Sequence, residues 1–271
     1  MSIAHAAPSL LRRLRVLAQL AGATLCAVPA HAGEVRLAVA TNFAQAIDKL
    51  KPIFEASTGH RLIITTGSTG KLYAQVKSGA PFDVLLAADA QTPQRLIDEG
   101  DAVAASRFTY ALGQLVLWSA TPGRVGTDGA ATLRALQFRH LVVANPQLAP
   151  YGAAARDALR ALGVWDSVQA KLAYAQNIGH AYSMVASGNA ELGLLALSQV
   201  RAGADGVRGG AGGVDGSSWP VPAALHAPIR QDAVLLTHGQ ANDGARAFLE
   251  ALKSPQTRRL IESFGYAVEY P

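Results

Sequence analysis

Strand and helix signals alternate along the chain, and this alternation starts again once; it limits the possible folds more than any other feature of the sequence. Apolar, β-branched runs such as 35–40, 61–66 and 84–88 each precede a stretch with apolar residues at helical spacing, and glycine ends most of these stretches. Strands that alternate with helices require βαβ units, in which a mainly parallel sheet is flanked by helices. The pattern resumes near residue 141, so we predict an α/β protein of two lobes.

Two β-rich stretches are predicted to cross between the lobes, one between the two repeats of the pattern and one in the last quarter of the chain. We therefore expect residues 33–112 and 229–271 to form lobe 1, and residues 113–228 to form lobe 2. Within lobe 2, residues 203–218 contain seven glycines and few apolar side chains. This composition is typical of a flexible surface loop.

The first 32 residues have the composition of a secretory signal peptide. Three arginines and no acidic residue precede an apolar run from Val16 to Ala30, and Ala30-His31-Ala32 then places small residues on both sides of one position. The apolar run is too short to span a bilayer comfortably. We expect residues 1–32 to be removed during export.

The charge of the remaining 239 residues excludes several classes of function. The full chain has 24 basic and 19 acidic residues, but three of the basic ones lie in the leader, which leaves a net charge of +2. A nearly neutral protein has no electrostatic reason to bind nucleic acid or a membrane surface. The one cysteine, Cys26, also lies in the leader. An exported, cysteine-free protein without an anchor is expected in the bacterial periplasm.

Metal-binding and catalytic signatures are absent from the sequence. The histidines of the exported part show no ligand spacing, and no G-x-S-x-G motif occurs. The segment Gly67–Lys71 lacks the first glycine and the final Ser or Thr of a phosphate loop. We therefore expect a binding protein rather than an enzyme, with no cofactor and no metal ion. The alternative from another class is a secreted hydrolase that uses a serine with His180.

Four predicted strand-to-helix junctions carry short polar side chains or a tyrosine. Their residues are Thr41, Asn42, Ser68, Thr69, Tyr151, Asn177 and Ile178. The first N–H groups of a helix have no partner within that helix, and the helix dipole is positive there, so each junction can attract an anion. Two junctions fall in each predicted lobe, at the carboxyl ends of strands where α/β proteins bind ligands. We expect all four to meet around one small anion between the lobes.

The chemistry of these donors favours a fully deprotonated anion. None of the proposed donors is charged, and a tetrahedral dianion needs donors only, whereas hydrogen phosphate needs an acceptor for its own proton. Asp83 and Asp89 flank the third predicted strand, but they are expected to begin that strand and to cap a turn. The pattern therefore favours molybdate, tungstate or sulfate over phosphate.

Several motifs resemble, in the same order, those of the periplasmic molybdate-binding proteins of ABC transporters. They are Ala40-Thr41-Asn42-Phe43, Thr66-Gly67-Ser68-Thr69-Gly70, Gly79-Ala80-Pro81-Phe82-Asp83-Val84 with Ala87-Ala88-Asp89, Asn145-Pro146, Ala149-Pro150-Tyr151-Gly152, Gly188–Leu192, Leu252-Lys253-Ser254-Pro255-Gln256 and Phe264-Gly265-Tyr266. The resemblance implies a class II periplasmic-binding-protein fold with its ligand in the cleft between the lobes. It also implies a monomer that captures molybdate or tungstate and delivers it to an inner-membrane permease. A binding protein for sulfate or another tetrahedral oxyanion is the alternative.

The resemblance also implies which residues hold the oxyanion from lobe 1. Asn42 and Thr69 match ligand positions of the family, and Thr41 and Ser68 lie next to them.

In lobe 2, the matching positions are Tyr151 and Ile178, of which Ile178 would contribute its backbone N–H. Some members of the family place a further tyrosine where this chain has Ala196. The hydroxyl of Tyr151 is therefore expected to reach the anion in its place.

Overall fold

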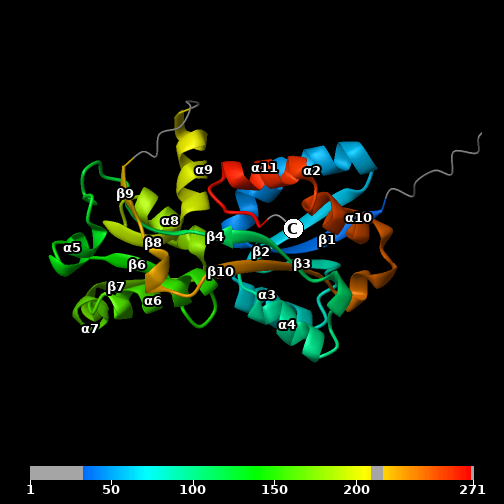
Figure 1. The fold of residues 1–271 in the computed structure, drawn as a ribbon, viewed down its shortest axis with the longest axis horizontal. Coiled ribbons are helices and arrows are strands. Elements are labelled where there is room, and N and C mark those ends of the chain that lie inside the picture. The colour runs from blue at the N-terminus through cyan, green and yellow to red at the C-terminus, as the bar shows by residue number, and fades with distance from the viewer. Residues whose placement is uncertain (1–32, 209–215, 270–271) are drawn as a thin grey trace, which may run out of the picture. The chain divides into compact units, whose positions relative to one another are not determined.

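The chain forms two five-stranded sheets, each flanked by helices (Figure 1). The computed structural model describes residues 33–208 and 216–269, with the backbone alone for residues 203–208. The signal peptide expected at residues 1–32 lies outside the described residues. Two mixed sheets with flanking helices confirm the predicted fold class.

The first sheet has the strand order β2-β1-β3-β10-β4. Its strands are β1 (Glu34–Ala40), β2 (Arg61–Gly67), β3 (Val84–Leu86), β4 (Phe108–Gly113) and β10 (Ile229–Leu235). Strand β1 pairs in parallel with β2 and β3, whereas β10 runs antiparallel to β3 and β4. The late strand β10 therefore completes the sheet that β1 begins.

Helices cover both faces of the first sheet (Figure 1). They are α2 (Ala44–Thr58), α10 (Asp243–Leu252) and α11 (Pro255–Ser263) on one face, and α3 (Thr69–Lys77) and α4 (Gln91–Asp98) on the other. The first core contains Phe54 and Phe248, whose rings meet edge to face, and the second contains Leu72 and Leu96. Gly59 ends α2 at a φ of 75°, a left-handed conformation that glycine adopts without strain.

The second sheet has the strand order β7-β6-β8-β5-β9. Its strands are β5 (Leu115–Ser119), β6 (Leu141–Ala144), β7 (Leu172–Ala175), β8 (Leu192–Ala196) and β9 (Ser217–Pro220). Its helices are α5 (Gly129–Arg134), α6 (Pro150–Ala161), α7 (Trp165–Val168), α8 (Ile178–Ala186) and α9 (Leu197–Arg208). Strand β6 pairs in parallel with β7 and β8, and β5 runs antiparallel to β8 and β9.

The chain passes from the first sheet to the second at Gln114, which separates β4 from β5, and it returns between β9 and β10. The first β-rich stretch that was predicted to cross between the lobes therefore consists of two strands, β4 and β5, which belong to different sheets. Short 3-10 helices complete the connections: η1 (Thr41–Phe43), η2 (Ala104–Ser106), η3 (Gln169–Lys171), η4 (Ala223–Leu225) and η5 (Thr237–Ala241).

The glycine-rich stretch 203–218 differs from the predicted loop at both of its ends. Helix α9 continues to residue 208, and Ser217 already begins β9. The first turns of α9 are anchored by the buried residues Val200 and Ala202, and each residue added to an existing helix gains a backbone hydrogen bond, so glycine does not stop it at once. At the other end, β9 pairs with β5. Residues 209–215 lie outside the described part of the chain.

Within residues 33–208 and 216–269, no helix combines the length and the apolar character needed to cross a lipid bilayer.

Candidate functional site

One small cavity brings together every residue that the sequence predicts for the site. It is lined by Thr41, Asn42, Ser68, Thr69, Tyr151, Asn177 and Ile178, together with Ala40, Gly67, Ala88, Ala149 and Pro150. The centre of a water-sized sphere can move over only about 10 Å³ inside it. Such a space suits a solute of a few atoms and excludes a sugar or a peptide.

Helices from both sheets begin at this cavity. The 3-10 helix η1 leads into α2 after β1, α3 follows β2, and α6 and α8 follow β6 and β7. The leading N–H groups of these helices lack carbonyl partners within their own helix and carry partial positive charge. The cavity therefore offers an anion several uncharged donors at once.

Two hydroxyl oxygens at the cavity are buried and make no hydrogen bond within the described residues. They are Oγ1 of Thr41 and Oγ of Ser68. Ser68 occupies the position before the first residue of α3, yet its side chain accepts no bond from the helix that it precedes. A buried hydroxyl without a partner costs about 1–3 kcal/mol, so both groups can gain a partner when a ligand enters.

The hydroxyls of Thr69 and Tyr151 each accept a hydrogen bond from the protein. The backbone N–H of Ala88 donates to Oγ1 of Thr69 at 3.0 Å, and Nε2 of Gln231 donates to the hydroxyl of Tyr151 at 3.1 Å. A hydroxyl has a single hydrogen, and in both residues it remains available to a ligand. Burial raises the pKa of Tyr151 well above its ordinary range, so this hydroxyl stays a neutral donor at physiological pH.

The side-chain amide of Asn42 donates its hydrogen bonds to other side chains of the protein and not into the cavity. Its Nδ2 donates to Oε1 of Gln231 at 2.7 Å and to the hydroxyl of Tyr266 at 3.0 Å. Both amide hydrogens are thus engaged, and the donor that Asn42 can offer is its backbone N–H at the start of η1. Sequence reasoning missed Gln231 and Tyr266 because they follow Asn42 by 189 and 224 residues.

Asn177 also has a structural task. Its Oδ1 accepts a hydrogen bond from the backbone N–H of His180 at 2.9 Å and so caps α8. The next residue, the buried Ile178, opens the helix with a backbone N–H at the cavity. Ala196 is buried at the end of β8, where it pairs with Leu115 and brings no hydroxyl.

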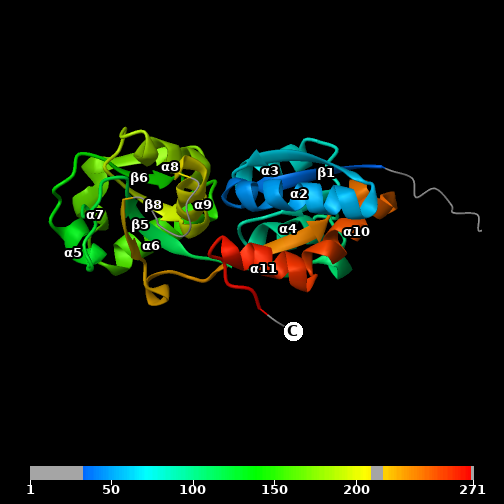
Figure 2. The same ribbon diagram turned by 90° about the horizontal axis from the view of Figure 1, so that it is seen from above.

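Hydrogen bonds connect elements of the first sheet directly to elements of the second. The N–H of Gly70 donates to the carbonyl of Leu148 at 2.9 Å, and Nζ of Lys71 donates to Oε1 of Gln176 at 3.1 Å. Figure 2 shows α9 next to the beginning of α2, and Nε2 of Gln199 on α9 donates to the carbonyl of Thr41, in η1 just before α2, at 3.0 Å. The structure is therefore closed around the cavity.

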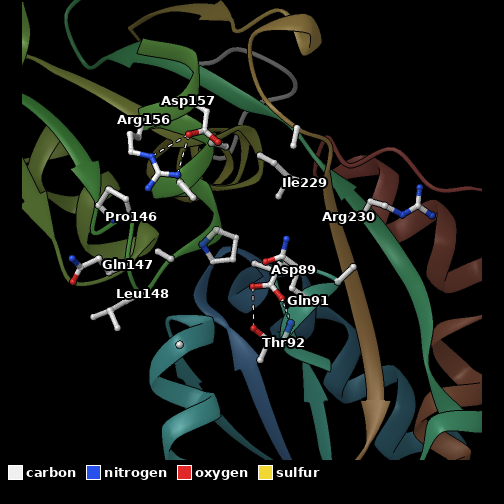
Figure 3. Close-up of a pocket in the computed structure, with 18 of the residues that line it drawn as sticks. Asp89, Gln91, Thr92, Pro146, Gln147, Leu148, Arg156, Asp157, Ile229 and Arg230 are labelled. Carbon is white, nitrogen blue, oxygen red and sulfur yellow. Dashed lines mark hydrogen bonds and ion pairs between the residues drawn. The ribbon is translucent and has the colours of Figure 1, made fainter. Parts of the chain in front are cut away.

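A larger groove of about 590 Å³ borders the small cavity (Figure 3). The two share the lining residues Ala88, Ala149 and Pro150. On one wall of the groove, the carboxylate of Asp89 accepts hydrogen bonds from N–H and Oγ1 of Thr92 at 2.7 and 3.2 Å. Burial raises the pKa of Asp89, and the bonds from Thr92 oppose this effect.

The arginines of this groove are paired with carboxylates. Arg156 lies 3.0 Å from Asp157, and Arg230 lies 2.7 Å from Glu269. Because each guanidinium has a carboxylate partner, the groove has little uncompensated positive charge to attract an anion.

Residues that could support other chemistry are engaged elsewhere. Asp83 accepts a bond from Nδ2 of Asn242 at 3.1 Å and lies 2.9 Å from Nδ1 of His238, so it is no acceptor at the cavity. The exposed ring of His180 accepts a weak bond from the N–H of Gln176 at 3.5 Å. Within the described ranges, no group of three or more His, Cys, Asp or Glu residues could hold a metal ion.

Comparisons with known proteins agree with this geometry. The family described as bacterial extracellular solute-binding protein matches residues 35–267. The molybdate-binding protein ModA of Azotobacter vinelandii is 48% identical over 248 residues, covering 92% of this chain and 95% of the relative. ModA of Rhodobacter capsulatus is 44% identical, covering 90% and 92%. The structure of the A. vinelandii periplasmic molybdate-binding protein superposes with a TM-score of 0.81 at 38% identity, covering 87% of this chain and 100% of that one.

Proposed function

The chain belongs to the bacterial extracellular solute-binding protein family, and on this premise we propose that it captures molybdate through uncharged hydrogen-bond donors. The observation that carries the proposal is the cavity itself. Helices from both sheets begin there, and among residues 33–208 and 216–269 two buried hydroxyls lack partners and no carboxylate or cationic side chain lines the cavity. Uncharged donors with no carboxylate beside them suit a fully deprotonated tetrahedral anion. The names of the two ModA relatives support molybdate as that anion.

The proposed ligand set combines side chains with backbone groups. The hydroxyls of Thr41, Ser68, Thr69 and Tyr151 donate to the oxyanion, together with the backbone N–H groups of Asn42 and Ile178. This assignment keeps all of the predicted positions except the side chain of Asn177, which caps α8. Asn42 contributes its backbone N–H to this set, because both hydrogens of its side-chain amide are engaged within the protein.

The proposed working cycle is a hinge motion between two lobes. Residues 33–112 and 229–271 form lobe 1, and residues 113–228 form lobe 2, which follows the division into two sheets. The lobes open at the two crossing segments, close on the anion, and present the closed surface to an inner-membrane permease. The protein acts as a monomer in the periplasm after loss of residues 1–32, and tungstate binds in the same way as molybdate.

Sulfate is the second candidate ligand, because it is also a tetrahedral dianion that needs donors only. The two candidates differ in size, and isothermal titration of the purified protein with molybdate, tungstate, sulfate and phosphate separates them. We expect one tight site for molybdate and tungstate, weaker binding of sulfate, and the weakest binding of phosphate. Sulfate binding as tight as that of molybdate would change the assigned ligand, and binding of none of the four would contradict the proposal.

A further inference from the structure

Gln231 joins the two sides of the cavity without lining it. It lies on β10, is fully buried, and is followed directly by a shift in the register between β10 and β4. Its Oε1 accepts a hydrogen bond from Nδ2 of Asn42, in η1 beside the first sheet, at 2.7 Å. The hydroxyl of Tyr110, on β4, lies 3.1 Å from this oxygen and 3.1 Å from the carbonyl oxygen of Ala87, so the two oxygens share its single hydrogen. Its Nε2 donates to the hydroxyl of Tyr151, on α6 of the second sheet, at 3.1 Å.

The directions of these hydrogen bonds follow from their neighbours. The hydroxyl of Tyr266 lies 2.7 Å from the carbonyl oxygen of Asn42 and 3.0 Å from Oγ of Ser198, which itself donates to that carbonyl. Tyr266 therefore donates its only hydrogen to one of these two acceptors. Toward the Asn42 side chain, Tyr266 can then only accept, so Nδ2 faces both Tyr266 and Gln231. Gln231 must consequently turn its oxygen toward Asn42 and its NH₂ group toward Tyr151.

The fixed amide of Gln231 determines what Tyr151 can do. A tyrosine hydroxyl that accepts a bond from an NH₂ group must direct its own hydrogen elsewhere, and Tyr151 lines the anion cavity. We propose that Gln231 is a positioning residue of the oxyanion site, which holds Tyr151 as a donor toward the anion and disfavours its use as an acceptor. This inference rests on the proposed function and adds a residue outside the ligand set.

The backbone at Gly113 restricts the positions that the side chains of Tyr151 and Gln231 can take. A Cβ atom at position 113 would lie 2.1 Å from the hydroxyl of Tyr151 and 2.7 Å from Nε2 of Gln231. The two groups therefore pack directly on the last residue of β4, at the passage between the sheets. Because the backbone of Gly113 packs against both groups, the side chain of Tyr151 has little room to move away from the cavity.

The proposal predicts a contribution of Gln231 to selectivity as well as to affinity. A Tyr151 hydroxyl that already accepts a bond from Gln231 is a poor acceptor for the proton of hydrogen phosphate. Reversing the polarity of the residue behind Tyr151 should therefore reduce the preference for molybdate over phosphate. If Gln231 had a purely structural role, its substitution would weaken the binding of molybdate and of phosphate by the same factor.

The first test is a double-mutant cycle, measured by calorimetry with molybdate. Gln231→Met removes the donor behind Tyr151, and Tyr151→Phe removes the hydroxyl itself. We expect each variant to bind molybdate at least about tenfold more weakly, and the double variant to be no more than about twofold weaker than the worse single variant, since both lose the same contact. Wild-type affinity in Gln231→Met, or losses that multiply in the double variant, would overturn the proposal.

The second test reverses the hydrogen bond with a residue of the same shape. In Gln231→Glu, an ionised carboxylate accepts the hydrogen of Tyr151 and repels the dianion, whereas a protonated carboxyl can donate again. The titratable groups that bond to Gln231 are the hydroxyls of Tyr110 and Tyr151. Tyr266 bonds to the neighbouring Asn42, and Asp232 is paired with Arg107 at 2.6 Å. We expect the molybdate affinity of this variant to rise as the pH falls from about 8.5 to about 6, while the wild type stays flat.

The controls separate three kinds of failure. Thr257→Val removes a buried polar group from α11 and should lower stability without changing molybdate affinity. If Gln231→Met does not fold, the pH profile and the molybdate-to-phosphate ratio of Gln231→Glu decide the matter, and a flat profile with an unchanged ratio counts against the proposal. A wild-type protein that binds none of the oxyanions would instead refute the proposed function.

Discussion

Gly179 in the first turn of α8 touches Thr41 in η1 so closely that a Cβ atom at position 179 would lie 2.6 Å from Cγ2 of Thr41. The contact joins an element of the second sheet to one of the first, directly beside the anion cavity. Gly70 makes a similar approach, since its Cβ would lie 3.1 Å from the carbonyl oxygen of Leu148. Both glycines therefore permit the closed arrangement of the two sheets.

Gly179→Ala should weaken molybdate binding by interfering with closure. The added methyl group meets the side chain of Thr41, and overpacking of this kind costs about 1–3 kcal/mol, which corresponds to a roughly 5- to 150-fold loss of affinity. In the proposed open form the two sheets move apart and the contact is lost, so thermal stability without ligand should not fall. Calorimetry measures the affinity, and Gly126→Ala is the matched control because a Cβ there meets nothing within 4 Å. Unchanged affinity in Gly179→Ala would contradict the role of this contact.

Ser68→Ala should separate ligand binding from folding. The Ser68 hydroxyl is buried and has no partner in the described residues, so its removal costs the free protein no hydrogen bond and can raise its stability slightly. A hydrogen bond to a charged ligand contributes about 1.5–3 kcal/mol, and molybdate affinity should fall by that amount. Calorimetry and thermal unfolding of the same sample test both statements. Full affinity together with a loss of stability would show that the hydroxyl serves the fold instead.

Thr69→Ala should behave differently from Ser68→Ala. Oγ1 of Thr69 accepts the N–H of Ala88, which would be left buried without a partner in the variant. We expect a loss of both ligand affinity and stability, the latter by about 1–3 kcal/mol. Denaturant unfolding without ligand measures the stability term. A stability equal to that of Ser68→Ala would mean that the bond to Ala88 is not important for the fold.

Local sequence patterns were sufficient to predict which residues line the small cavity. A strand that ends in Thr or Ser followed by a helical repeat is specified within about ten residues, as at Ser68 and Thr69 between β2 and α3. The parallel arrangement of such units then places the junctions at one edge of the sheet. Sequence alone therefore predicted the fold class and the residues that line the cavity.

The hydrogen-bond partners of those residues could not be predicted, because they come from distant parts of the chain. Gln231 and Tyr266 lie on β10 and after α11, and nothing near them in the sequence indicates contact with Asn42. The commitment of the Asn42 amide to these partners is a tertiary effect. The same reason explains β9, which is specified by its pairing with β5 rather than by the apolar content of its own four residues.

The pH dependence of stability should be dominated at the alkaline end by buried tyrosines. Burial raises the pKa values of Tyr110, Tyr151 and Tyr266, whereas in the unfolded chain each returns to about 10. Above that pH the unfolded chain releases protons that the folded protein keeps, so the free energy of unfolding should be constant near neutral pH and fall above about pH 10. Molybdate affinity should stay level from about pH 6 to 9. Titration calorimetry and denaturant unfolding across this range test both, and a steep change in affinity near pH 7 would indicate a titrating group at the site.

Gly113→Ala should displace Tyr151 from its position at the cavity, because the new methyl group would occupy the space of the Tyr151 hydroxyl. The clash at 2.1 Å leaves Tyr151 no alternative but to move, which should lower stability by about 1–3 kcal/mol and weaken molybdate binding. Adding Tyr151→Phe removes the oxygen that is too close, although Cζ of the ring still lies 2.8 Å from the methyl position. The double variant should therefore be more stable than Gly113→Ala alone, yet bind molybdate no more tightly, since the donor is gone. Thermal unfolding and calorimetry on the three variants measure these effects, and a double variant less stable than Gly113→Ala would show that the two positions do not interact as the distances indicate.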